Sequence, residues 1–202
     1  MNRLGMMIDI SHVSDSTFYQ VIRLSKAPVI ASHSSCRHFT AGWERNMDDE
    51  MIKALAKNGG VIHINFGSSF LDDNYRQTED KMWNYFQEHK ISPNSEAGKA
   101  YVKKFRAETG LGYADIKDVV AHIDHVVKLV GVDHVGFGSD FDGVGDSLPT
   151  GLKSVADYPN IIYALLKKGY SDADIQKICS GNLFRVWSEV ENIAQKLQAS
   201  ND

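Results

Sequence analysis

His12, His33 and Asp140 have side chains that can bind a metal ion. Each lies at the end of a short apolar run of the sequence or shortly after it. Neutral imidazole and carboxylate are both good ligands for Zn²⁺, and a zinc site with an open position also holds a water molecule. The ion can lower the pKa of that water to roughly 7, so that hydroxide becomes available as a nucleophile at neutral pH. These residue types therefore suggest metal-assisted hydrolysis.

The elements predicted around these side chains place them at one edge of a sheet. Short apolar runs predict strands at residues 6–10, 28–33, 61–66 and 133–139. Helical periodicity predicts helices at residues 16–25, 50–57, 115–130, 160–168 and 171–179, and from residue 182 onward. Repeated strand–helix units imply a parallel sheet, and ligand sites in such folds form at the carboxyl ends of the strands.

Residues 67–113 interrupt this alternation. They are polar and carry two amphipathic helical patterns, around residues 81–89 and 97–108. We interpret them as a helical loop insertion within a single partial barrel domain that covers residues 1–202. Four strands are too few to close a (β/α)₈ barrel, which typically has about 250 residues. The predicted fold is therefore α/β, as half of a (β/α)₈ TIM barrel with about four parallel strands and covering helices.

Several of these polar residues also have a purely structural interpretation. A histidine at a strand end is more often a satisfied polar group than a ligand, and Asp140 alone could cap a turn. His122 and His125 are one helical turn apart, a spacing that can bind metal, but on an outer helix we favour a structural role. His38 could approach a substrate from the loop after His33, and we leave it out of the predicted site.

Composition narrows the class of protein. The chain has 202 residues, 43% of them hydrophobic and 24% charged, which suits a globular domain. A net charge of −4 without a long basic run argues against nucleic acid or an anionic membrane as a partner. The sequence has no apolar run long enough for a membrane span, and its first residues do not resemble a signal peptide. Cys36 and Cys179 are too far apart to suggest a CxxC motif, and the compartment stays undecided.

Several segments, taken in order, resemble the second half of the membrane (renal) dipeptidases, a family of zinc peptidases. They are MMIDISHVSD, PVIASHSSCR, GGVIHINF, HIDHVVKLVGVDHVGFGSDFDGVG and LPTGLKSVADYPNIIYALLKKGYSDADIQKICSGNLFRVW. Each segment alone is modest evidence, whereas the ordered set is specific and covers nearly the whole chain except residues 67–113. The resemblance implies a (β/α)₈ barrel with a binuclear zinc centre.

The resemblance also implies roles for individual residues. His12 and His33 match the two histidines that bind the second zinc, and Asp140 matches the carboxylate that binds the first zinc and handles a proton. Arg45 resembles the arginine that holds the free carboxylate of the dipeptide, an interaction suited to a bidentate guanidinium. The implied reaction is attack of a bridging hydroxide on the peptide carbonyl, with Asp140 moving a proton toward the leaving amine.

Other parts of the family's site would precede residue 1. They are a His-x-Asp motif, a glutamate that bridges the metals and a further histidine that binds substrate. We therefore expect an incomplete zinc centre, and we interpret Met1 as an internal methionine of a truncated or split gene product. Such a chain is expected to need its N-terminal half, or a second copy as a homo-oligomer, because a half barrel leaves sheet edges open.

Two other functions stay open. Another metal-dependent barrel amidohydrolase would need a lysine that bridges metals or a distinct phosphate loop, and neither is evident in the sequence. An inactive fragment would bind zinc weakly or not at all. Hydrolysis of dipeptides compared with tripeptides distinguishes these functions from a dipeptidase.

Overall fold

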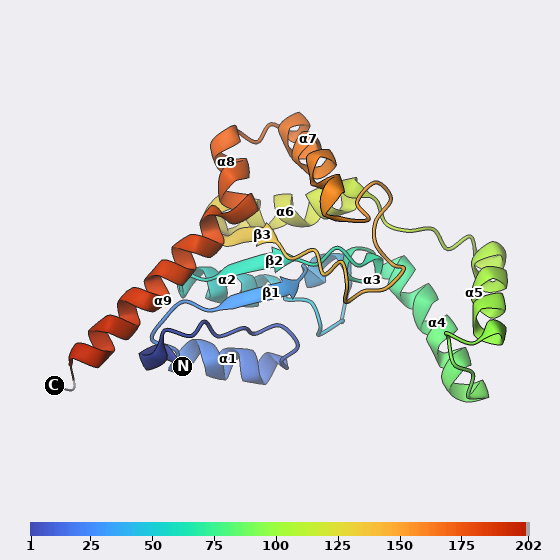
Figure 1. Ribbon diagram of the computed structural model, residues 1–202, viewed down its shortest axis with the longest axis horizontal. Helices are drawn as coiled ribbons and strands as arrows, with labels where there is room; N and C mark the ends of the chain where they lie inside the picture. Colours follow the sequence, from blue (N-terminus) through green and yellow to red (C-terminus); the bar gives the residue numbers. More distant parts are fainter. Residues whose placement is uncertain (201–202) are drawn as a thin grey trace.

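A parallel sheet of three short strands forms the centre of the fold in the computed structural model, which describes residues 1–200 (Figure 1). The strands lie in the order β1-β2-β3, with bounds β1 Ile30–Ser34, β2 Val61–Ile64 and β3 Val135–Phe137. Both strand pairings are parallel, so the carboxyl ends of the strands lie at one edge of the sheet. The α/β class and the parallel direction that the sequence predicts are thereby confirmed.

The central strand β2 is buried at every position, which suits its mainly apolar sequence, although His63 is among the buried residues. Its alternate side chains belong to two separate apolar clusters. Ile62 and Ile64 pack into the larger cluster, which includes residues of α2 and α6. Val61 packs into the smaller cluster, together with Val186 and Val190 of α9. Both faces of the sheet are therefore covered, as a parallel sheet requires.

The helices follow the predicted periodicity, and several begin at a capping side chain. The Ser14 hydroxyl accepts a hydrogen bond from the Thr17 N–H, and Ser171 and Asp174 form a capping box. The bounds are α1 Asp15–Leu24, α2 Asp49–Lys57, α3 Ser68–Leu71, α4 Asp73–His89, α5 Glu96–Thr109, α6 Ile116–Val130, α7 Tyr158–Lys168, α8 Asp172–Gln176 and α9 Asn182–Ala199. Within residues 1–200, no helix is both long and apolar enough to cross a bilayer.

The C-terminal helices differ in one respect from the prediction. The helix expected at residues 171–179 ends at Gln176, and a π-helical turn, Lys177–Gly181, joins it directly to α9. Helix α9 then crosses beside the sheet and returns to the N-terminal segment (Figure 1). There the Arg3 guanidinium donates to the Leu197 carbonyl, and the Gln198 amide donates to the Arg3 carbonyl.

Helices α4 and α5 extend away from the sheet, at the right of Figure 1. They form the two helical patterns expected within residues 67–113, although α4 begins earlier, at Asp73. The two helices pack through the stacked rings of Tyr85 and Tyr101, whose centroids are 3.8 Å apart. That this segment is an insertion within a single domain stays a prediction.

The predicted first strand, residues 6–10, is wrong in its extent. Only Asp9 bridges β1, opposite Ile30 and in the parallel direction. The Ile10 N–H donates to the Ile30 carbonyl and the Ile30 N–H donates to the Ile8 carbonyl, and the pairing then ends. It ends because the Ser32 N–H, the next donor on β1, turns to the Asp9 side chain instead of the backbone. The described sheet therefore has three strands and a bridge in place of four strands.

His122 connects α6 to the loop after β1 and to α3. Its Nδ1 accepts a hydrogen bond from the Cys36 N–H at 3.0 Å, and its Nε2 lies 3.1 Å from the Leu71 carbonyl oxygen, which fixes the proton on Nε2. The ring is fully buried, and this burial lowers the pKa of His122 to about 3. His122 is thus a neutral structural histidine, the role that we favoured from the sequence.

We expect the fold to lose stability as the pH falls below the ordinary histidine value of 6.5. Between pH 6.5 and about 3 the unfolded chain binds a proton that folded His122 does not bind. The free energy of unfolding therefore falls by up to about 1.4 kcal/mol per pH unit of acidification from this residue. Urea unfolding of wild type and His122→Gln between pH 4.5 and 6.5 measures the difference in slope. Equal slopes would contradict the assignment, and His89→Gln, at an exposed position, is the control.

Candidate metal and substrate site

His12 and His33 meet at the carboxyl edge of the sheet. Their Nε2 atoms are 2.9 Å apart, His33 lying on β1 and His12 on the turn after the Asp9 bridge. Two nitrogens bound at 2.0–2.1 Å to one tetrahedral zinc ion would be about 3.3 Å apart. A small opening of the pair would therefore let both rings bind a single ion, so the chemistry and spacing of these donors fit zinc.

The backbone at two of the three predicted ligands is strained. His12 has a φ of 68° and Asp140 a φ of 59°, in the left-handed region that most residues avoid. The remaining non-glycine residue with positive φ in the described chain is Lys90, which caps α4 in an ordinary way. Such conformations cost about 1–3 kcal/mol each and cluster where a side chain must be aimed at a ligand.

Asp140 follows β3, and Asn65, just beyond β2, orients its carboxylate. Asn65 is fully buried, and its Nδ2 donates to Asp140 Oδ2 at 2.8 Å, while its Oδ1 accepts from the Gly67 N–H. Oδ1 of Asp140 lies against Gly143, where a Cβ atom would come 2.0 Å from it and would force the carboxylate to move. The ligand atoms of His12, His33 and Asp140 do not all lie within 4.8 Å of one another, so Asp140 stands apart from the histidine pair.

Arg45 reaches back to the end of β1 from the loop that leads to α2. Its Nη2 donates to the His33 carbonyl at 2.8 Å, and its Nη1 donates to Ser34 Oγ at 2.9 Å. The guanidinium also lies over the Phe70 ring, 5.0 Å from the centroid. Burial lowers the pKa of Arg45, and the carboxylates of Asp140 and Asp9 oppose this shift. The predicted cation is thus held beside the histidine pair.

Asn46 fixes the loop that carries Arg45. Its side chain is fully buried, and Oδ1 accepts a hydrogen bond from the Ser35 N–H at 2.9 Å. Its Nδ2 donates to Thr40 Oγ1 at 2.8 Å and to the Phe70 carbonyl at 2.9 Å. All of the amide's hydrogen-bonding groups are thereby used within the fold, which sets the position of the neighbouring arginine.

Charge at the site favours neutral imidazole at His12. Although the ring is largely exposed, partial desolvation lowers the pKa of His12, and the neighbouring Arg45 guanidinium and His33 ring lower it further. The carboxylates of Asp140 and Asp9 act in the opposite direction. Because metal ions bind the unprotonated ring nitrogen, this balance suits a ligand.

Asp9 and Ser32 form a part of this site that we did not predict from the sequence. The Ser32 hydroxyl lies 2.5 Å from Asp9 Oδ2 and 2.7 Å from His33 Nδ1. The N–H groups of Ser11 and Ser32 both donate to Asp9 Oδ1. Burial raises the pKa of Asp9, but these hydrogen bonds outweigh it and hold the pKa below its ordinary value. The sequence feature that could have identified this part of the site is Asp9 itself, a carboxylate that interrupts the apolar run of residues 6–10.

The proton positions along this chain follow from the ionised Asp9. Since a carboxylate only accepts, the Ser32 hydroxyl donates to Asp9, and its oxygen accepts the proton of His33 Nδ1. The lone pair of His33 is then on Nε2, the atom that faces His12. Hydrogen bonds of this kind commonly fix the tautomer and orientation of metal-binding histidines.

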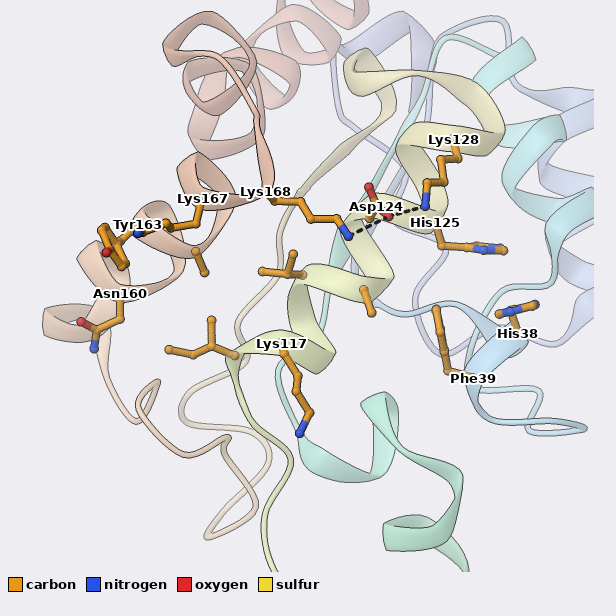
Figure 2. Close-up of a pocket in the computed structure, with 14 residues that line it drawn as sticks. His38, Phe39, Lys117, Asp124, His125, Lys128, Asn160, Tyr163, Lys167 and Lys168 are labelled. Atoms are coloured by element: carbon orange, nitrogen blue, oxygen red, sulfur yellow. Dashed lines mark ion pairs between the residues drawn. The ribbon is translucent and has the colours of Figure 1, made fainter.

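A hollow between α6 and α7 lies elsewhere in the fold (Figure 2). Its volume is about 830 Å³, and its walls include Ala121 and Ala164, with Lys117, Lys128 and Lys168 at the rim. None of the predicted site residues lines it. The site at the sheet edge is therefore defined by its polar side chains and not by the size of a cavity.

Comparison with known proteins connects this arrangement to one family. The family model described as "Membrane dipeptidase (Peptidase family M19)" matches residues 1–201. An uncharacterized dipeptidase of Schizosaccharomyces pombe is 34% identical over 198 residues, which are 98% of this chain and 39% of that protein.

Solved structures agree with this relationship. The probable dipeptidase PvdM of Pseudomonas aeruginosa superposes with a TM-score of 0.75 at 30% identity, over 95% of this chain and 52% of that one. A metallopeptidase of Rhodobacter sphaeroides, crystallised with a phosphinate mimic of the dipeptide L-Ala-D-Ala, gives 0.71 at 28% identity, over 94% and 44%. The chain thus spans about two fifths of the length of its curated relative and about half of the solved chains. The family match extends through every element described above, and this chain belongs to the membrane dipeptidase family, peptidase family M19.

Proposed function

We propose that this chain carries the zinc-binding and carboxylate-binding side chains of a dipeptidase that hydrolyses the peptide bond of dipeptides. The observation that carries the proposal is the His12–His33 pair, with Nε2 atoms 2.9 Å apart beside the guanidinium of Arg45. Metal ligands next to a fixed cation suit a small substrate with a free carboxylate. The relative crystallised with a dipeptide mimic supports this substrate class.

His12 and His33 would hold one zinc ion, and Asp140 would contribute to a second position on the same edge. A zinc ion bound there supplies Lewis acidity, which polarises a carbonyl and activates water. The residues of the chain determine where the substrate lies relative to it. The ionised Asp9, acting through Ser32, keeps the His33 lone pair directed toward the ion's position.

Arg45 would hold the C-terminal carboxylate of the dipeptide. Each of its two terminal nitrogens carries two protons and uses one of them, in hydrogen bonds to the His33 carbonyl and Ser34 Oγ. One N–H on each nitrogen is then left to donate to the carboxylate of the substrate. A tripeptide would place its carboxylate one residue too far from the histidine pair.

Asp140 would move a proton to the leaving amine. The Asn65 amide occupies Oδ2, and among residues 1–200 Oδ1 accepts no hydrogen bond. The carboxylate is thus fixed in orientation while one oxygen keeps its lone pairs for a proton. This is the geometry that general acid–base catalysis requires of a side chain.

We expect the assembled enzyme that contains this chain, supplied with zinc, to hydrolyse a dipeptide and to spare the corresponding tripeptide. Asp140→Asn should lower kcat by roughly 10²–10⁴-fold, because the proton carrier is lost. The His12→Ala/His33→Ala variant should hold about one zinc ion per chain fewer than the wild type, measured by elemental analysis of the same samples. Equal cleavage of the tripeptide would indicate another amidohydrolase, and bound zinc without any cleavage would indicate an inactive fragment.

Replacing Arg45 by methionine should raise KM for a dipeptide by about 10–100-fold. This is the effect expected when hydrogen bonds to a charged group, worth about 1.5–3 kcal/mol, are lost. The corresponding dipeptide amide, which lacks the carboxylate, should be a poor substrate that wild type and Arg45→Met cleave alike. Arg23→Met, at an exposed position on α1, is the matched control. An equal loss with both substrates would contradict a role in carboxylate binding.

Ser32→Ala should weaken zinc binding by about 10–100-fold, since it removes the link that orients His33. A chelator competition assay measures the zinc affinity, and Ser32→Thr, which keeps the hydroxyl, should restore most of it. Ser188→Ala on the exposed face of α9 tests for a general effect of the substitution. Wild-type affinity in Ser32→Ala would show that Asp9 and Ser32 have only a structural role.

A further inference from the structure

A second group of metal-competent side chains lies away from the histidine pair, on the surface between α2 and α6. It consists of His38, Asp49 and His125, whose ligand atoms all lie within 4.8 Å of one another. His38 is on the short 3₁₀ turn Arg37–Phe39, Asp49 is the first residue of α2, and His125 is on α6. Figure 2 shows the rings of His38 and His125 directed to the same side of α6.

The contacts within this surface cluster are close. His125 Nε2 lies 2.7 Å from Asp49 Oδ1. The rings of His38 and His125 are stacked, with centroids 4.4 Å apart and an interplanar angle of 19°. Two imidazoles and a carboxylate, with water in the remaining positions, are a ligand set that divalent transition-metal ions prefer.

The elements that carry the cluster are fixed independently of any ion. Arg37 forms a two-pronged ion pair with Asp15 of α1, at 2.8 and 2.7 Å, and its Nε donates to the Asn46 carbonyl. On the other side, the buried hydrogen bonds of His122 hold α6 to the same loop. An ion that binds here would meet elements already fixed in the fold, so the rearrangement on binding is confined to the side chains.

Space for solvent ligands is present on both sides of His38. A hollow of about 290 Å³ is bordered by His38, Gly42 and Asp49, and the groove between α6 and α7 begins at His38 and His125. The Asp49 side chain is 41% exposed and that of His125 is 18% exposed. The cluster can therefore take up an ion from solution and retain bound water.

We propose that His38, Asp49 and His125 form a second metal site, which takes a divalent transition-metal ion of the zinc class and is separate from the His12–His33 pair. Binding requires the exposed His38 ring to rotate out of the stack and the His125–Asp49 contact to open by about half an ångström, toward the spacing of two zinc ligands. The ion would join the loop of residues 35–48 to α2 and α6. Because Arg45 lies on the same loop, the ion would stabilise the segment that positions this guanidinium.

Zinc titration of the His12→Ala/His33→Ala variant tests this site, because that background removes the histidine pair at the sheet edge. We expect about one zinc ion per chain and a rise in melting temperature on binding. His38→Ala or His125→Ala in the same background should lower the affinity at least tenfold and remove the rise. His89→Ala, which removes an exposed helical histidine stacked on Tyr85, should change neither measurement.

Two results would overturn the proposal. One is a folded His12→Ala/His33→Ala variant, with an unchanged circular dichroism spectrum, that binds no zinc. The other is zinc binding that persists unchanged in both His38→Ala and His125→Ala, which would place the ion elsewhere. His38 is exposed, so its replacement tests the site even where loss of the His125–Asp49 contact weakens the fold. The measurement does not depend on dipeptide hydrolysis, so its outcome and that of the proposed function are separate.

Discussion

The carboxylate of Asp9 joins the N-terminal segment to the sheet, and the site depends on this connection. It accepts hydrogen bonds from the N–H groups of Ser11 and Ser32 and from the Ser32 hydroxyl. The same contacts end the backbone pairing after Ile10, which turns the chain away from β1. As a result His12 leaves the sheet with a left-handed backbone and faces His33. One partly buried acid thus sets the strand's end, the direction of one histidine and the tautomer of the other.

The loop of residues 35–48 has a comparable function on the other side of β1. Asn46 is its fixed point, since every polar group of its buried amide is bonded within the fold. Arg45 lies next to this point and extends toward the His12–His33 pair, whereas His38 lies near the loop's other end and extends toward α6. A single loop therefore connects the two groups of side chains, and under the proposal above an ion at the surface cluster would act on the segment that positions Arg45.

The sequence predicts most of the fold because its signals are local. Apolar runs identify β1, β2 and β3, and helical periodicity with capping residues identifies most helices to within a few positions, but α4 begins eight residues before the predicted helix and α3 was not predicted. The first strand could not be predicted correctly, because its extent is decided by a side chain 23 residues away in sequence, Ser32, which binds Asp9. For the same reason the sequence shows His12 and His33 as separate strand-end histidines but does not show the Asp9–Ser32 connection between them. His125 was given a structural role because α6 was expected to be an outer helix, which says nothing of what lies beside it on the surface, and His38 was left out of the predicted site as a loop residue that could approach a substrate.

The two groups of ligands differ in what their geometry requires. At the sheet edge the strained backbone and the hydrogen-bonded tautomer are set by contacts within the fold, so the energetic cost of aiming His12 and His33 is met by folding. At the surface cluster no such strain exists, and part of the binding free energy must be used to rotate His38 and open the His125–Asp49 contact. Preorganisation therefore favours tighter binding at the histidine pair than its exposure alone would suggest. The surface cluster is better suited to an ion that exchanges with solution. Its occupancy would change over a range of metal concentrations at which the histidine pair would already be occupied.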